Sequence, residues 1–209
     1  KTGRGFYRYG AEADRPAPAT LPPGAAPRDV AGDPLTDLPK GRRVEIDGAT
    51  AIALTDGRTA TERMAAEGGL PLVLVDLALD LRAAGRVAIA AADQASADDL
   101  ARAAGLFQAM GKAVSRLDDV PGMLVMRTVC MLANEAADAV SQGVCDAAAV
   151  DTAMRLAVNY PRGPLAWADE VGIERVAMVL ANLAAGYGED RYRTSPLLRR
   201  RLLAGRSLA

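Results

Sequence analysis

The chain of 209 residues contains no histidine. Histidine is the commonest general acid or base near neutral pH and a frequent metal ligand. A Ser-His-Asp triad and a His-ligated metal site are therefore excluded for this sequence. Any catalysis by this chain would depend on Asp, Glu, Lys, Tyr or Cys side chains.

The sequence also lacks an excess of charge of one sign. Its 25 basic and 26 acidic residues leave a formal net charge of −1, which gives no field that attracts a nucleic-acid backbone or an anionic membrane surface. Long hydrophobic runs are missing as well, because the apolar stretch LPLVLVDLALDL at 70–81 is interrupted by Asp76 and Asp80. A membrane-spanning helix needs about 18 or more apolar residues. We therefore expect no nucleic-acid partner and no membrane partner.

Cysteine is scarce. Cys130 lies inside an apolar helical pattern and Cys145 lies beyond its end, so the two residues indicate neither a disulfide framework nor a metal site. The first residues show no basic region followed by an apolar core and a cleavage site, the pattern of a secretory signal. The interpretation is a cytoplasmic protein with reduced, structural thiols.

Proline marks a change of composition near the start of the chain. Residues 10–41 hold seven of the twelve prolines, separated by alanine, glycine and charged residues. This composition is typical of an extended, poorly packed linker. Residues 1–9, KTGRGFYRY, precede the linker and have the aromatic and glycine content of a more compact segment.

Residues 42–120 alternate between strand and helix patterns. Helix signals are Thr59 or Thr61 at one start and Ser96 at another, where Asp98 and Asp99 fill the first turn. Because strand and helix alternate, we expect a small, mostly parallel sheet. Short apolar runs favour strands at 49–57, 70–79, 85–93 and 112–120.

From Pro121 onward the apolar residues recur with a period of 3.6. Residues 122–142 are predicted to form one long, largely buried helix that ends at Gly143. Start signals at Asp146, Pro164 and Ser195 favour further helices. These are predicted at 146–157, 161–172, 173–186 and 195–205. The predicted fold class is mixed, with a small degenerate α/β region (42–120) followed by an all-α helical bundle (121–209).

Three stretches of the helical half carry a resemblance to a known family: DDVPGMLVMRTVCMLANEAADAVSQGV, VDTAMRLAVNYPRGPLAWADEVG and EDRYRTSPLLRRRLLAGR. Together they resemble the C-terminal domain of the 3-hydroxyacyl-CoA dehydrogenase family. The opening KTGRGFYRY is similar to the segment with which that domain ends. The resemblance implies that one helical domain ends within residues 1–9 and that residues 121–209 are a second copy. Residues 42–120 would then be a degenerate, Rossmann-like nucleotide-binding domain.

Within the family, the chain resembles the C-terminal part of two-domain 3-hydroxybutyryl-CoA or 3-hydroxyadipyl-CoA dehydrogenases. The resemblance implies a parent enzyme that oxidises a 3-hydroxyacyl-CoA to the 3-ketoacyl-CoA with NAD as cofactor, in fatty-acid or aromatic catabolism. In single-domain relatives the helical domain forms the dimer interface. The segment in hand would therefore act as a scaffold, packed on the first helical copy or paired with itself as a homodimer. The acyl-CoA substrate would bind through the parent enzyme.

Three features that the family uses for chemistry are missing. The turn after the first strand reads TDGRTATE, in place of the glycine-rich G-x-G-x-x-G that admits a dinucleotide. Asp76 and Asp80 stand in the segment where the family has its catalytic histidine, and carboxylates of ordinary pKa do not replace an imidazole. Met126 stands where the family has an asparagine, and a thioether donates no hydrogen bond. We expect no catalytic residue, no bound NAD and no metal on this chain.

Four residues are candidates for a substrate-pocket wall, and each has a structural alternative. Asn134 and Glu135, in LANEA, match a family motif, and Glu135 lies eight residues from Arg127 on the same helix side. The alternative for this pair is hydrogen bonding between helices. Tyr160 and Pro164, in NYPRGPLAW, would shape a pocket wall or else form a turn that stacks an aromatic core.

Other features have two interpretations as well. Arg199, Arg200 and Arg201 could meet CoA phosphates, but consecutive helical residues point in different directions, which favours a solvated or ion-paired face. The helix start at Thr59 could attract an anion or be an ordinary capped turn. For the whole chain, the alternatives to the scaffold are a stand-alone binding or assembly module and an enzyme of different chemistry that uses Asp, Glu or Cys.

Overall fold

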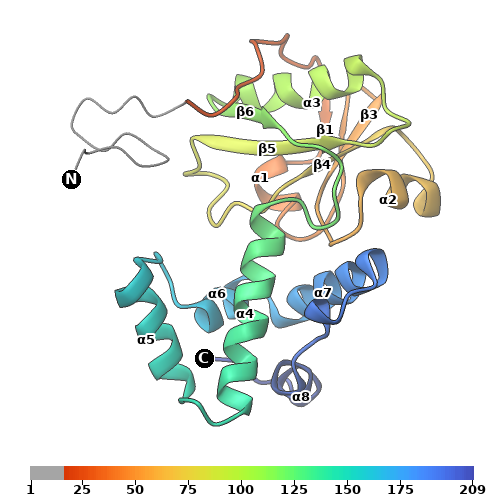
Figure 1. The fold of residues 1–209 in the computed structure, drawn as a ribbon. Helices are drawn as coiled ribbons and strands as arrows, with labels where there is room; N and C mark the ends of the chain where they lie inside the picture. Colours follow the sequence, from red (N-terminus) through yellow and green to blue (C-terminus); the bar gives the residue numbers. More distant parts are fainter. Residues whose placement is uncertain (1–16) are drawn as a thin grey trace, which may run out of the picture.

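The computed structural model describes residues 17–209. The predicted domain tail at 1–9 and the first part of the predicted linker lie outside the described residues. Within them, a half built on a six-stranded sheet is followed by a helical half, and helix α4 joins the two (Figure 1). The elements are β1 (Val30–Ala31), α1 (Pro34–Asp37), β2 (Val44–Ile46), β3 (Thr50–Leu54), α2 (Ala60–Glu67), β4 (Leu72–Val75), β5 (Arg86–Ala91), α3 (Ala97–Ala109), β6 (Ala113–Arg116), α4 (Val125–Ser141), α5 (Ala147–Val158), α6 (Pro164–Val171), α7 (Ile173–Tyr187), the 3-10 turn η1 (Asp190–Tyr192) and α8 (Pro196–Ala204).

The strands lie in the sheet in the order in which they occur along the chain, β1 to β6. The pairs β3–β4 and β5–β6 are parallel, whereas β1–β2, β2–β3 and β4–β5 are antiparallel. The prediction of a mostly parallel sheet is therefore wrong. The physical reason lies between Val75 and Arg86, where the connection is short and contains no helix. A parallel crossover needs about a dozen or more residues, usually with a helix, so the chain turns back instead.

The segment 17–41 packs on the sheet, in contrast to the poorly packed linker predicted for 10–41. The backbone N–H of Leu21 donates to the carbonyl of Val114 on β6 at 2.8 Å, and Leu38 is fully buried. The same segment supplies β1 and α1. Proline is compatible with this packing because Pro34 occupies the first position of α1, where no backbone donor is needed.

Alternate residues of the strands face two separate cores. Ile52, Val73 and Val75 belong to a cluster with Phe107 of α3. The neighbouring positions in β3 and β4, such as Leu72, belong to a second cluster with α2. This alternation is the period of two that a strand imposes, and it places α3 on one face of the sheet and α2 on the other.

The helix starts were predicted well because the capping signals are local. Thr59 and Ser96 each form a capping box, with Glu62 and Asp99 respectively, and Asp146 caps α5. Ser195 occupies the predicted N-cap position of α8, but its hydroxyl makes no capping hydrogen bond. This hydroxyl is buried and has no hydrogen-bond partner among the described residues.

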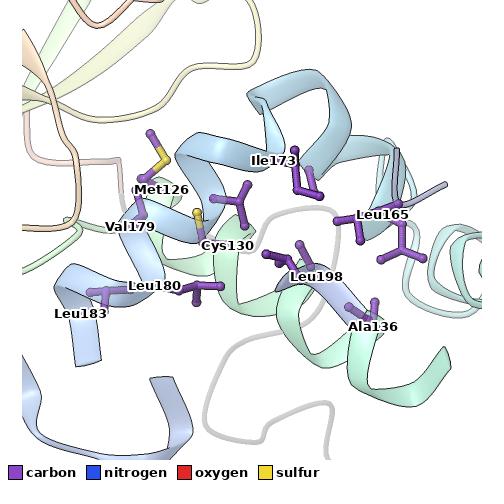
Figure 2. Packing of buried hydrophobic residues seen from close by; sticks show 14 of the residues in the cluster. Met126, Cys130, Ala136, Leu165, Ile173, Val179, Leu180, Leu183 and Leu198 are labelled. Carbon is purple, nitrogen blue, oxygen red and sulfur yellow. The ribbon is translucent and has the colours of Figure 1, made fainter. Parts of the chain in front are cut away.

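Helix α4 is the centre of the helical half and contacts α5, α6, α7 and α8. Figure 2 shows Met126, Cys130 and Ala136 along α4, facing side chains of the surrounding helices. The facing residues include Leu165 of α6, Val179, Leu180 and Leu183 of α7, and Leu198 of α8. The prediction of a long, largely buried helix ahead of a helical bundle is confirmed for α4.

The two cysteines provide a test of this packing. Cys130 is fully buried and burial raises the pKa of its thiol to about 12, whereas Cys145 is half-buried. Because the thiolate is the reactive form, Cys130 should resist alkylation at pH 8. We expect iodoacetamide to label Cys145 alone in the folded chain and both residues in urea, measured by peptide mass spectrometry. Equal labelling of both residues without urea would contradict this packing.

Candidate functional site

The two halves of the molecule meet at the N-terminus of α4, around the carboxylate of Asp76. Asp76 follows β4 directly and is 4% exposed. One oxygen, Oδ2, accepts hydrogen bonds from the backbone N–H groups of Leu124 at 3.0 Å and Val125 at 2.7 Å. The other oxygen, Oδ1, accepts from the N–H of Met126 at 3.0 Å and from that of Leu77 at 2.8 Å.

The Asp76 carboxylate, from the sheet half, caps the N-terminus of α4 in the helical half. Leu124, at the N-cap position of α4, offers no side-chain hydrogen bond. The first N–H groups of a helix have no partner within the helix and carry a partial positive charge, so an anion is well placed there. Asp76 therefore satisfies the start of α4 and links the sheet half to the helical half.

The same contact brings together two positions that the sequence singled out separately. The resemblance implies that Asp76 lies in the segment of the family's histidine and Met126 at the position of its asparagine. The structure places the Met126 backbone on the Asp76 carboxylate, while the Met126 side chain is fully buried in the core of the helical half. An apolar side chain and a carboxylate that accepts four hydrogen bonds leave no free proton donor or acceptor at this point.

A second carboxylate occupies the N-terminus of α2, the other place where an anion could have bound. Asp119 accepts hydrogen bonds from the N–H of Ala60 at 2.6 Å, the N–H of Thr61 at 2.9 Å and the Thr61 hydroxyl at 2.7 Å. Thr59 completes the capping of this helix with Glu62. The structure favours the capped turn over an open anion site, because the protein supplies the anion itself.

Two further contacts hold the halves together. The side-chain amide of Asn182 on α7 donates to the carbonyl of Asp56 at 2.8 Å. Gly57 has φ +99°, and a Cβ there would lie 2.7 Å from the carbonyl oxygen of Val179. Only glycine fits this turn, since any side chain would push the sheet half away from α7.

Asn134 ties α4 to the segment that leads into α8. Its side-chain amide donates to the carbonyl of Arg193, and its Oδ1 accepts from the N–H of Ser195, both at 2.8 Å. The residue is almost fully buried. Its polar atoms are therefore engaged by the backbone of this segment rather than by another helix.

Glu135 is exposed and lines a hollow of about 300 Å³ with Arg191 and Arg193. Arg127, predicted on the same side, donates to the hydroxyl of Tyr187 at 2.9 Å instead. The hollow also includes Asn134. It is small and polar, which is unlike the mostly apolar clefts that bind acyl chains.

Tyr160 and Pro164 do not line the hollow that contains Asn134 and Glu135. Tyr160 is half-buried, and Pro164 is buried at the first position of α6. The carboxylate of Asp151 accepts hydrogen bonds from the first N–H groups of α6. The structure does not gather the four candidate residues into one site, and their role in a substrate pocket stays a prediction.

An aromatic stack joins α7 and η1. The rings of Tyr187 and Tyr192 are stacked, with centroids 5.0 Å apart, and neither belongs to the NYPRGPLAW turn. Arg199 and Arg200 are exposed on α8, and Arg201 is half-buried. Within residues 17–209 these three arginines form no ion pair. For the exposed Arg199 and Arg200, the structure therefore favours a solvated face over an ion-paired one.

Sequence reasoning missed three residues that bind distant backbone groups. Asp119 accepts from the N–H of Ala60, Asn182 donates to the carbonyl of Asp56, and Arg175 of α7 donates to the carbonyl of Pro39. Their partners are far away in the sequence, and their local patterns carry no distinguishing signal. In the described part of the chain, no group of three or more His, Cys, Asp or Glu residues could hold a metal ion. None of the helices within residues 17–209 is long and apolar enough to cross a membrane.

Two family profiles match the chain in succession. The 3-hydroxybutyryl-CoA dehydrogenase reduced Rossmann-fold domain matches residues 52–121. The 3-hydroxyacyl-CoA dehydrogenase C-terminal domain matches residues 122–208. The predicted fold class, a degenerate Rossmann-like region followed by a helical domain, is thereby confirmed.

Individual relatives agree with these profiles. The 3-hydroxyadipyl-CoA dehydrogenase of Escherichia coli K12 is 44% identical over 160 residues, which are 76% of this chain and 32% of the relative. A probable 3-hydroxybutyryl-CoA dehydrogenase of Bacillus subtilis is 38% identical over 100 residues, 48% of this chain and 35% of the relative. The chain thus spans about a third of the length of these curated relatives.

A solved structure extends the similarity to nearly the whole chain. The crystal structure of 3-hydroxybutyryl-CoA dehydrogenase from Escherichia coli K12 superposes with a TM-score of 0.81 at 38% identity. The match covers 94% of this chain and 40% of that protein. The arrangement of sheet half and helical half is therefore shared with that protein.

Replacing Asp76 tests the junction. We expect Asp76→Ala to lower the free energy of unfolding by about 3 kcal/mol. Water can replace the lost acceptor at the exposed Leu124 and Val125, so most of the loss comes from the buried Met126 donor, which would be left unpaired. Asp76→Asn keeps one acceptor oxygen. Its free energy of unfolding should therefore lie between those of Asp76→Ala and the unmodified chain. The measurement is urea unfolding followed by circular dichroism.

Asp80→Asn is the matched control. Asp80 is exposed and only closes a local turn through the N–H groups of Arg82 and Ala83. Its replacement should change the free energy of unfolding by less than about 0.5 kcal/mol. Similar stabilities for Asp76→Ala and the unmodified chain would remove Asp76 from its structural role.

Proposed function

The chain belongs to the 3-hydroxyacyl-CoA dehydrogenase family, as a reduced Rossmann-fold domain joined to that family's C-terminal domain, and from this premise we propose that it is part of an NAD-dependent 3-hydroxyacyl-CoA dehydrogenase. The parent enzyme would oxidise a 3-hydroxyacyl-CoA to a 3-ketoacyl-CoA in fatty-acid or aromatic catabolism. The catalytic residues and the NAD site would lie outside this chain. The chain itself would serve as a scaffold in that enzyme.

One observation supports the scaffold role: the Asp76 carboxylate is already hydrogen-bonded to the backbone at the start of α4. A general base must offer a lone pair within hydrogen-bond reach of the substrate proton. The Asp76 carboxylate already accepts four backbone N–H groups, and Met126 offers no donor beside it. Asp119 in turn fills the N-terminus of α2. These contacts support a chain that has no catalytic residue and binds no NAD.

A direct assay tests this proposal. Incubated with NAD and 3-hydroxybutyryl-CoA, the chain should form no NADH, measured by absorbance, and titration with NADH should give no saturable change in nicotinamide fluorescence. The control is an active 3-hydroxybutyryl-CoA dehydrogenase of the family under the same conditions. Turnover by this chain, or saturable NADH binding, would overturn the scaffold role.

We further propose that the helical half packs on another helical copy of its kind. In the intact enzyme this copy would be the domain whose end is the predicted segment 1–9. The support is α5, a helix rich in apolar residues. None of them is fully buried, and Ala147 and Val150 pack only partly buried against the core of the helical half. Leu156 is 73% exposed and Val158 is 48% exposed, and Val144, just before this helix, is 72% exposed. Exposed apolar side chains that gather along one helix are typical of a protein interface.

The α5 surface predicts concentration-dependent self-association of the chain on its own. Sedimentation velocity at tens of micromolar should show dimers, and Leu156→Glu should shift the population to monomers by placing a charge on the surface. Gln94→Glu, exposed in the sheet half and away from α5, is a control for added charge and should leave the association unchanged. A chain that sediments as a monomer throughout would speak against this interface.

The competing function is a stand-alone binding or assembly module with no part in an active site. The exposed apolar surface of α5 fits that function as well. Titration with acyl-CoA and with NADH tests whether this chain shares in an active site. Binding of acyl-CoA alone would favour a pocket-wall role, whereas binding of neither would favour a scaffold or assembly role. We also propose a cytoplasmic location, which the free thiols of Cys130 and Cys145 support.

A further inference from the structure

A cavity of about 480 Å³ lies where the sheet half meets the helical half, beside the Asp76 contact. Its wall comes from both halves and is of mixed character, with ten apolar residues and six charged ones. The apolar lining includes Leu35, Leu54, Leu77, Leu79, Leu81 and Val171. A cleft of this size between two domains, with an apolar part and charged groups that can orient a ligand, has the properties of a small-molecule site.

Arg175 of α7 provides a positive charge in this cavity. Its Nη2 donates to the carbonyl of Pro39 at 2.5 Å, across the junction between the halves. Within residues 17–209, Arg175 forms no ion pair with a carboxylate. Burial lowers the pKa of Arg175, which means that the guanidinium has lost water without gaining a counter-charge.

The acidic residues around the cavity are already engaged. Asp76 accepts hydrogen bonds from the start of α4, and Asp80 accepts from the backbone of its own turn. Glu170 forms an ion pair with Arg162 at the rim. Arg82 and Arg162 also line the cavity, but both are exposed, whereas Arg175 is half-buried. An incoming anion would meet Arg175 without displacing a carboxylate.

We infer that this cavity binds a small amphipathic carboxylate, such as a short-chain fatty acid, with its carboxylate on Arg175 and its hydrocarbon chain against the leucine-rich wall. A guanidinium presents parallel N–H donors that match both oxygens of a carboxylate. Partial burial strengthens this attraction, because less water screens it. The apolar wall favours a ligand with a hydrocarbon tail over a bare anion. This inference goes beyond the scaffold role, since such binding needs neither NAD nor turnover.

The experiment is isothermal titration calorimetry of the whole chain with hexanoate. Hexanoate should bind saturably, and acetate and hexanol should each bind more weakly, because one lacks the tail and the other the charge. Arg175→Met should weaken hexanoate binding at least about ten-fold, since a charge-assisted hydrogen-bond pair is lost. Arg155→Met, on exposed α5 and away from the cavity lining, should bind hexanoate like the unmodified chain.

A second variant covers the case in which Arg175→Met fails to fold, which circular dichroism would reveal. Leu79→Asp places a carboxylate on the partly exposed wall and should abolish hexanoate binding while the fold is kept. Three results would overturn the inference. They are the absence of saturable hexanoate binding at millimolar concentration, equal binding by the folded variants and the unmodified chain, and inorganic phosphate binding as tightly as hexanoate.

Discussion

The carboxylate of Asp76 and the first N–H groups of α4 form the contact on which the arrangement of the two halves depends. Helix α4 is the centre of the helical half, and it begins with no capping side chain of its own. The N–H groups of Leu124, Val125 and Met126 have no partner within the helix, so the helix needs an acceptor from elsewhere. The sheet half supplies that acceptor at the end of β4. Each half therefore completes the other at this point.

The same solution recurs at other places in the molecule. Asp119 accepts from the start of α2, Asp151 from the start of α6, and Asp169 from the backbone of Leu208 and Ala209 near the end of the chain. In each case a carboxylate distant in sequence satisfies backbone donors. A helix start prefers a negative charge, so carboxylates are efficient in this role. Many acidic residues of this nearly neutral chain thus connect segments.

These contacts bear on function because they engage carboxylates that would otherwise be free to act as a general acid or base. The resemblance implies that the corresponding positions of the family carry a histidine and an asparagine. Here Asp76 and Met126 are joined by a backbone hydrogen bond and serve the packing of the helical half. A cleft nevertheless persists beside them, with Arg175 as a half-buried cation. At this junction Asp76 and Met126 serve the packing of the two halves, and the cleft lies beside them.

The sequence by itself determined what depends on neighbouring residues. The capping boxes at Thr59 and Ser96, the alternation in the strands and the long apolar stripe of α4 are encoded within a few positions, and so are the motifs of the family. The tertiary structure decided the direction of β5, the packing of 17–41 on the sheet and the partners of Asp76 and Asp119. Asp76 and Met126 are 50 residues apart, and their contact forms only when both halves are packed. Local sequence patterns do not predict such a contact. Its contribution to stability depends on a donor and an acceptor from distant segments being paired when the protein folds.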